Sequence, residues 1–141
     1  MLFRSELIAA KKGWNEALLD MFRHVEHVYK WGIYDRDPLE RWVVDRAVLI
    51  GDAAHPMMPT LAQGAAISIE DGYALARNLA AVDDVDAGLA AFERERVPRA
   101  RAVQLQARAQ FEDNRMVPAP PPRDRDWIFR HDVTVPPTIT N

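Results

Sequence analysis

The chain has 141 residues, 48% of them hydrophobic and 28% charged, which is typical of one globular domain. The formal net charge of −3 gives no basic excess, so we expect neither a nucleic acid nor a membrane surface as a partner. The sequence contains no cysteine, which excludes disulfides and thiolate metal sites, and it has no apolar run of the roughly 18 residues that suggest a membrane span. We therefore expect a cytoplasmic protein that binds small molecules or other proteins.

The first third of the sequence predicts two helices and two strands. A helix is expected from Ser5, broken near Gly13 and resumed with apolar residues on one face. Alternating large side chains at positions 29, 31 and 33 predict a strand over residues 28–34 with one buried face. The apolar run of residues 46–51 predicts a further strand, buried on both faces as in a parallel sheet.

Helical periodicity then dominates the sequence. It predicts a helix over residues 65–81 and a second, long helix with Asp86 as its N-cap and a kink at Pro98. Residues 117–122 favour an extended polyproline conformation. The apolar residues 127–129 are expected either to dock on the domain or to belong to a loose tail, and residues 136–141 to form a frayed end.

The residues between the second predicted strand and the next helix have the chemistry of a ligand site. Asp52 follows a strand directly and can accept hydrogen bonds from sugar or polyol hydroxyls, although it could also simply cap a turn. Gly51 keeps the backbone slim beside a ligand. Gly64 opens a helix, so the amides of Ala65 and Ala66 lack intrahelical partners and suit an anionic or carbonyl oxygen, such as that of a redox flavin.

The spacing of these residues resembles a known family. The motif consists of Gly-Asp-Ala-Ala-His at residues 51–55, Pro59, Gln63-Gly64 and Glu70-Asp71. It resembles the second flavin motif of class A FAD-dependent aromatic hydroxylases, the salicylate hydroxylase-like and para-hydroxybenzoate hydroxylase-like flavoprotein monooxygenases. Residues 34–39 and 95–99 add to a resemblance that covers about residues 5–112. One departure is Ala62, where many relatives have glycine.

The resemblance implies an α/β fragment, mostly helical with two or three short strands, from the C-terminal part of a glutathione-reductase-like FAD-binding fold. Residues 1–45 would end a substrate domain, residues 46–115 would form the FAD-binding segment, and residues 116–141 a Pro-rich tail. FAD would be the cofactor, reduced by NADH or NADPH, and an aromatic acid such as salicylate or a hydroxybenzoate would be hydroxylated with O2. The implied FAD contacts are Gly51, Asp52, Pro59, Gly64, Ala65 and Ala66, with Pro59 near the reacting flavin face.

No Gly-x-Gly-x-x-Gly motif occurs, so the N-terminal Rossmann βαβ unit that would hold the ADP moiety is lacking here. We expect the catalytic base to lie upstream of Met1 and leave the catalytic residues unknown. A separate N-terminal chain or a homodimer is the expected protein partner. The alternative is a truncated, inactive remnant or a protein-interaction module unable to bind FAD alone.

Several other polar or aromatic residues have two interpretations. His55 precedes a proline in a tight loop and is expected to be structural rather than a catalytic base. Glu70 and Asp71 point about 100° apart on a helix and are expected to favour the helix dipole. The arginines between positions 94 and 108 are interpreted as a solvated helix face, and no metal site is expected. Among the tryptophans, only Trp31 is suspected of lining a substrate pocket.

Overall fold

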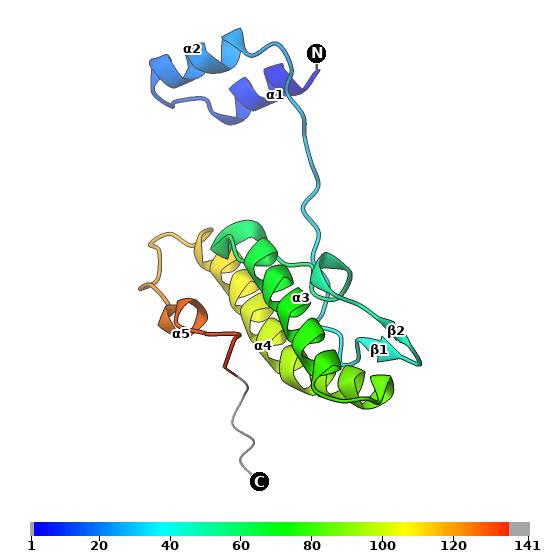
Figure 1. The fold of residues 1–141 in the computed structure, drawn as a ribbon. Coiled ribbons are helices and arrows are strands. Elements are labelled where there is room, and N and C mark those ends of the chain that lie inside the picture. The colour runs from blue at the N-terminus through cyan, green and yellow to red at the C-terminus, as the bar shows by residue number, and fades with distance from the viewer. Residues whose placement is uncertain (1, 136–141) are drawn as a thin grey trace. The chain divides into compact units, whose positions relative to one another are not determined.

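The computed structural model describes residues 2–135, and the chain divides into two units, Met1–Ile33 and Tyr34–Asn141 (Figure 1). The elements are α1 (Leu2–Ala10), α2 (Glu16–His24), β1 (Val43–Val44), β2 (Ala47–Val48), the 3-10 turns η1 (Gly51–Ala53) and η2 (Pro59–Leu61), α3 (Gly64–Ala80), α4 (Val85–Asp113) and α5 (Asp126–Phe129). The prediction of a mostly helical α/β fragment with short strands is confirmed. Within residues 2–135, no helix is both long and apolar enough to cross a membrane.

The first unit contains the predicted pair of helices. Asn15 caps α2, since its side chain accepts a hydrogen bond from the Ala17 amide at 2.9 Å. Gly13 lies in the connection with φ +90°, a left-handed conformation that glycine adopts without strain. Leu19 of α2 is buried. The predicted break near Gly13 is therefore confirmed.

The strand predicted over residues 28–34 does not form. The only sheet in the described part of the chain is the β1–β2 hairpin. Tyr29, Trp31 and Ile33, which the alternation placed on a buried face, are 73%, 81% and 57% exposed. A strand needs a neighbouring backbone to pair with, and residues 2–135 provide none for this segment. The prediction is wrong for this chain because the alternation of side chains identifies a strand without supplying its partner.

The strand predicted over residues 46–51 is shorter and differently paired than expected. β1 and β2 form an antiparallel hairpin, with Val43 opposite Val48 and Val44 opposite Ala47. Val48 packs against the core, whereas Leu49 and Ile50 are about two-fifths exposed. Burial on both faces requires a layer on each face, and the described residues place none over Leu49 and Ile50. The prediction of a doubly buried strand is therefore wrong.

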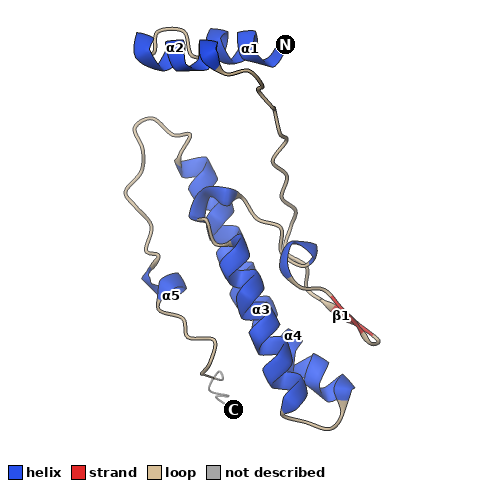
Figure 2. Cartoon of the chain, turned by 45° about the horizontal axis from the view of Figure 1, so that its top comes forward, coloured by secondary structure: helices blue, strands red, loops and turns tan. Residues whose placement is uncertain are grey.

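The helices α3 and α4 form an antiparallel pair that dominates the second unit (Figure 2). Asp84, and not the predicted Asp86, is the N-cap of α4, because its Oδ1 accepts a hydrogen bond from the Asp86 amide at 3.0 Å. Near the connection, a Cβ on Gly88 would lie 3.2 Å from the backbone of Leu79, so the helices approach closely there. Helix α4 continues without interruption through Pro98.

The core of the second unit lies between these helices and the segments packed on them. Ile67 and Ala74 of α3 meet Phe92 of α4, and all three side chains are fully buried. Trp42 packs on Phe92 with ring centroids 6.0 Å apart. Ile128 of α5, only 3% exposed, belongs to the same cluster. The segment of residues 127–129 is thus docked on the domain through Ile128, although Phe129 is 64% exposed, while residues 136–141 lie outside the described part.

Candidate functional site

The GDAAH loop, residues 51–55, leaves β2 in a tight turn. Gly51 has φ +59°, and the amides of Ala54 and His55 both donate hydrogen bonds to its carbonyl oxygen at 2.8 Å. A Cβ on Gly51 would lie 3.0 Å from the Oγ of Ser68 on α3. Glycine is favoured at this position both by its left-handed backbone and by the close approach of α3.

A buried carboxylate on α3 holds the GDAAH loop. Asp71 Oδ2 accepts a hydrogen bond from the Gly51 amide at 3.1 Å and lies 2.6 Å from His55 Nε2. On its other side, Arg96 Nε of α4 donates to Asp71 Oδ1 at 2.9 Å. All three side chains, Asp71, His55 and Arg96, are at most 1% exposed. These contacts fit the structural role that the sequence favours for His55.

The surroundings of Asp71 keep its carboxyl group ionised. Burial acts to raise the pKa of Asp71, but hydrogen bonds from His55, the Gly51 amide and Arg96 outweigh burial and lower the pKa below its ordinary value. A buried carboxylate that is multiply hydrogen-bonded is stable in its charged form. The loop is therefore held by charge-assisted hydrogen bonds.

The neighbouring Glu70 extends this network along the helix pair. Arg96 Nη2 lies 2.8 Å from Glu70 Oε2, and Arg99 contacts both Glu70 oxygens, at 3.0 and 3.2 Å. Burial acts to raise the pKa of Glu70, but hydrogen bonding and charge from Arg99 and Arg96 lower it.

These ion pairs contradict two predictions made from the sequence. Glu70 and Asp71 serve ion pairs to α4 rather than the helix dipole, and the arginine face of α4 is not uniformly solvated because Arg96 is fully buried.

A second arginine, Arg36, holds the loop by donating to the loop's carbonyl oxygens. Arg36 Nη2 donates to the carbonyl oxygens of Ala53 and Ala54, the latter at 3.3 Å. Gln104 of α4 fixes the Arg36 backbone, since its Nε2 donates to the Arg36 carbonyl and to the Pro56 carbonyl, each at 2.8 Å. The loop is thus held by Arg96 through Asp71 and by Arg36 through carbonyl oxygens.

Of the predicted cofactor contacts, Asp52 lies close to the start of α3, whereas Gly51 is buried against that helix. Asp52 is exposed, and a Cβ on Gly64 would lie 3.9 Å from Asp52 Oδ1. The first intrahelical hydrogen bond of α3 runs from the Ile67 amide to the Gln63 carbonyl. The amides of Gly64, Ala65 and Ala66 come before it and have no partner within the helix. Ala65 and Ala66 are also exposed. A carboxylate acceptor and first-turn amide donors therefore share one surface.

The connection from the loop to α3 passes through the turn η2. Pro59 begins this turn and is exposed, whereas Leu61 is buried. Thr60 Oγ1 donates to the Ala107 carbonyl of α4 at 2.6 Å, which ties the turn to the helix pair. Ala62, the departure from the family pattern, has φ +53° and ψ +33°. A left-handed backbone favours glycine, which fits the glycine that the family resemblance implies at this position.

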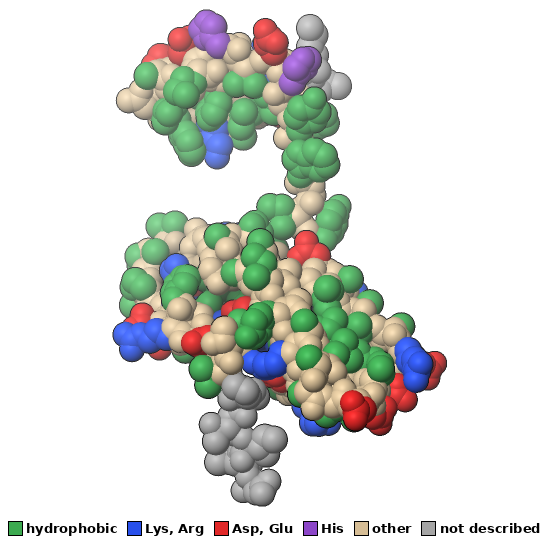
Figure 3. Space-filling view, viewed as in Figure 1, with side chains coloured by type: hydrophobic (Ala, Val, Ile, Leu, Met, Phe, Trp, Pro, Cys, Tyr) green, Lys and Arg blue, Asp and Glu red, His purple; other side chains and the backbone are tan. Residues whose placement is uncertain are grey.

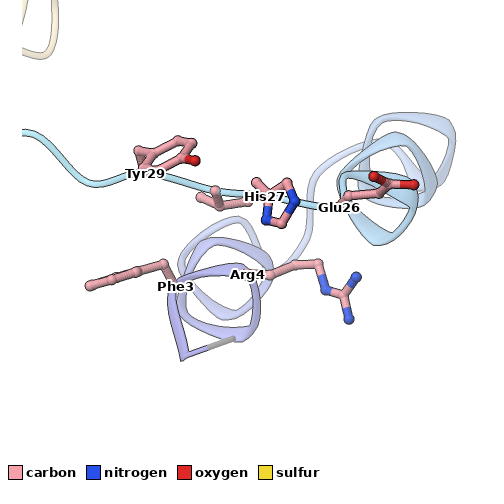
Figure 4. Close-up of a pocket in the computed structure, with 6 residues that line it drawn as sticks. Phe3, Arg4, Glu26, His27 and Tyr29 are labelled. Atoms are coloured by element: carbon pink, nitrogen blue, oxygen red, sulfur yellow. The ribbon is translucent and has the colours of Figure 1, made fainter.

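A pocket in the first unit does not coincide with this surface. Figure 4 shows it between α1 and the chain that follows α2. It is lined by Phe3, Arg4, Glu26, His27, Val28 and Tyr29. None of the predicted FAD contacts belongs to it, because those residues all lie in the second unit. The candidate site is an exposed surface formed by a loop and a helix start.

Comparison with known proteins identifies the family of the chain. A family model described as an FAD binding domain matches residues 9–107, which is more than half of the sequence. The chain belongs to the FAD binding domain family. The predicted resemblance to flavoprotein monooxygenases is confirmed, since this chain is similar to several curated monooxygenases.

Two relatives and two solved structures illustrate the similarity. A 3-amino-4-hydroxybenzoate 2-monooxygenase from Streptomyces platensis is 38% identical over 86% of this chain and 31% of its own length. A 6-hydroxynicotinate 3-monooxygenase from Pseudomonas fluorescens is 38% identical over 92% of this chain and 33% of its own length. A salicylate hydroxylase substrate complex matches with a TM-score of 0.73, 27% identity and coverage of 97% of this chain and 38% of that chain. An HpxO variant from Klebsiella pneumoniae complexed with FAD matches with a TM-score of 0.68, 28% identity and coverage of 76% and 30%.

These matches identify the family and show how much of each relative's length the chain covers. This chain spans about a third of the length of the curated relatives it matches. The family and the FAD complex support FAD as the cofactor. Sequence reasoning missed the residues that hold the GDAAH loop, above all Arg36 and Arg96. The signal for them was present, because both lie in the strings at residues 34–39 and 95–99 that resemble the family.

Proposed function

We propose that the chain is the C-terminal part of an FAD-dependent monooxygenase that hydroxylates an aromatic acid. The relatives named above support this proposal, since they are monooxygenases of hydroxybenzoate-like and hydroxynicotinate substrates. The salicylate hydroxylase match supports the same substrate class. NADH or NADPH is the proposed reductant and O2 the proposed oxidant.

The observation that carries the proposal is the shared surface of Asp52 and the start of α3. Asp52 would accept hydrogen bonds from the ribityl hydroxyls of FAD. The first-turn amides of Gly64 and of the exposed residues Ala65 and Ala66 would donate to the oxygen at the pyrimidine edge, where the helix dipole also favours negative charge. FAD, when bound, supplies the redox chemistry. The residues of the chain would bind and orient it, with Pro59 near the reacting face and with Gly51, which is buried, allowing the close approach of α3 beneath the loop.

We propose the following division of labour along the chain. Residues 1–45 end the substrate domain, residues 46–115 bind FAD, and residues 116–141 form the tail. The ADP moiety would be held by groups outside these 141 residues, because the sequence has no Gly-x-Gly-x-x-Gly motif. A separate N-terminal chain is the proposed source of those groups, because a homodimer, the other proposed assembly, would bring no Gly-x-Gly-x-x-Gly motif of its own.

A titration of the purified chain with FAD, followed by flavin fluorescence, tests the proposal. Micromolar binding, roughly −8 kcal/mol, would show that the chain forms a usable site. Asp52→Ala should then weaken binding by about 1.5–3 kcal/mol, roughly 10- to 150-fold, because a charged acceptor is lost. Asp83→Ala is the matched control, since Asp83 is also exposed but follows α3 at its other end.

The titration is repeated with the N-terminal two thirds of a relative added in trans, which would supply an ADP site. If FAD binds in neither setting, or if Asp52→Ala and Asp83→Ala bind FAD equally well, the proposed site is wrong. Gly64→Val provides a second probe. Its branched side chain would project toward Asp52 Oδ1, which is already 3.9 Å from a Cβ placed at Gly64.

The second candidate function is a protein-interaction module or an inactive remnant. The exposed apolar side chains of the first unit favour it, because they form a surface suited to a partner (Figure 3). These include Phe3, Trp14, Leu18, Met21, Tyr29 and Trp31. Absence of FAD binding in both settings would favour this function over the enzyme.

A further inference from the structure

The C-terminal segment, residues 123–135, folds back along the α3–α4 pair and is called the strap here (Figure 2). Its Ile128 is buried in the core, and Trp127 Nε1 donates to Gln106 Oε1 of α4 at 3.0 Å. Gln106 Nε2 in turn donates to the Asp124 carbonyl at 2.7 Å. Arg77 of α3 donates to the Val133 carbonyl. The strap therefore makes specific polar contacts to both helices.

Arg99 connects the strap to the network beneath the GDAAH loop. Its Nη2 donates to the Ile128 carbonyl at 3.0 Å, and its guanidinium lies 5.4 Å from the centre of the Trp127 ring. The same guanidinium forms the two-point ion pair with Glu70. Arg99 is thus shared between the strap and a carboxylate of α3.

From Glu70, polar contacts continue to the loop without a gap. Arg96 bridges Glu70 Oε2 at 2.8 Å and Asp71 Oδ1 at 2.9 Å. Asp71 then accepts a hydrogen bond from the Gly51 amide at 3.1 Å and lies against His55. The strap and the loop are therefore the two ends of one chain of charged hydrogen bonds.

The burial of Arg96 makes this chain of contacts consequential. Arg96 is fully buried, and its Nη1 has no hydrogen-bond partner among residues 2–135. Its charge is stabilised by Asp71, Glu70 and a 3.4 Å contact with the Ile67 carbonyl. Without Arg99, only Arg96 and a 3.7 Å contact with His131 would hold Glu70 within the described residues, so its carboxylate could turn toward water more often and leave Arg96 with one carboxylate partner. A buried charge with fewer partners weakens the structure around it.

We propose that the strap is a positioning element for the GDAAH loop, with Arg99 and Glu70 as the positioning residues that couple them. This inference rests on the proposed function only in assigning the loop to FAD; the coupling itself concerns the chain alone. A strap that merely covers the core would protect from exchange only the amides of the residues it touches. A strap that positions the loop also affects the Gly51 and His55 amides, which it does not touch.

Amide hydrogen exchange, measured by NMR on the full 141-residue chain without FAD, tests the proposal. Arg99→Gln should speed exchange of the Gly51 and His55 amides by about tenfold or more, because the hydrogen bonds that protect them open more often. The Leu19 amide of α2, in the other unit, should be unchanged. Arg130→Gln is the matched control, since it removes an exposed ion pair with Asp126 inside the same strap.

The proposal is overturned if Arg99→Gln speeds exchange in the strap but leaves the Gly51 and His55 amides as in the wild type. It is also overturned if Arg130→Gln affects those amides equally. Arg99→Lys keeps the charge and should restore part of the protection. If Arg99→Gln loses its helical circular dichroism signal, Trp127→Ala provides the same comparison, because that side chain is 38% exposed and borders Arg99. FAD affinity is measured separately, so failure of FAD binding leaves the exchange result intact.

Discussion

Replacing Gly51 with alanine should destabilise the second unit by about 2 kcal/mol. The left-handed backbone at φ +59° costs an L-residue roughly 1–2 kcal/mol. The new Cβ would also lie 3.0 Å from Ser68 Oγ, and moving that hydroxyl disturbs its 2.8 Å hydrogen bond to the Gly64 carbonyl, which costs about 0.5–1.5 kcal/mol. The lower entropy of the unfolded alanine chain offsets roughly 0.4–1 kcal/mol.

Urea unfolding followed by the helical circular dichroism signal measures this loss. Gly72→Ala is the matched control, because a Cβ there meets nothing within 4 Å and its helical backbone is ordinary. That variant should be more stable by about 0.5–1 kcal/mol. Adding Ser68→Ala to Gly51→Ala should recover the steric part of the loss and leave the backbone part. A Gly51→Ala chain that is as stable as the wild type would refute the reasoning.

Acidification should destabilise the chain below about pH 4. Asp71 and Glu70 have lowered pKa values in the folded state, so their stabilisation is complete above the ordinary carboxyl pKa of about 4 and is lost as pH falls through the folded values. Thermal unfolding at a series of pH values measures this loss, and Asp71→Asn, destabilised by roughly 3–5 kcal/mol at neutral pH, should show a flatter pH dependence. Ala62→Gly should stabilise the chain by about 0.5–1 kcal/mol in urea unfolding, since it relieves a left-handed backbone at φ +53°. An Ala62→Gly chain that is less stable than the wild type would contradict that explanation.

Local periodicity was enough to predict α1 to α4 but not the short helix α5. Helix α3 begins at Gly64, the residue predicted to open it, and its buried Ile67 and Ala74 follow the expected spacing. The strands were less predictable because pairing depends on distant residues. Residues 28–34 alternate as a strand does, yet no neighbouring backbone in the described residues completes it.

In the candidate site, too, local features could be predicted from the sequence and long-range contacts could not. Asp52 and the start of α3 could be placed together from a strand, a loop and a helix in succession. The burial of Arg96 could not, because a charged residue in a helix rich in Arg and Glu has the pattern of a solvated face. Its burial follows from the facing Asp71 and Glu70, and only tertiary structure reveals that those carboxylates point toward α4.

The support of the GDAAH loop has a consequence for protein engineering. Five consecutive residues form the loop, but its conformation depends on side chains 15 or more positions away in either direction, from Arg36, Asp71 and Arg96. Grafting residues 51–55 alone onto another scaffold would leave the Gly51 amide and the Ala54 carbonyl without these partners. A transplantable unit is therefore discontinuous: it comprises the loop, the segment around Arg36 and the facing turns of both long helices.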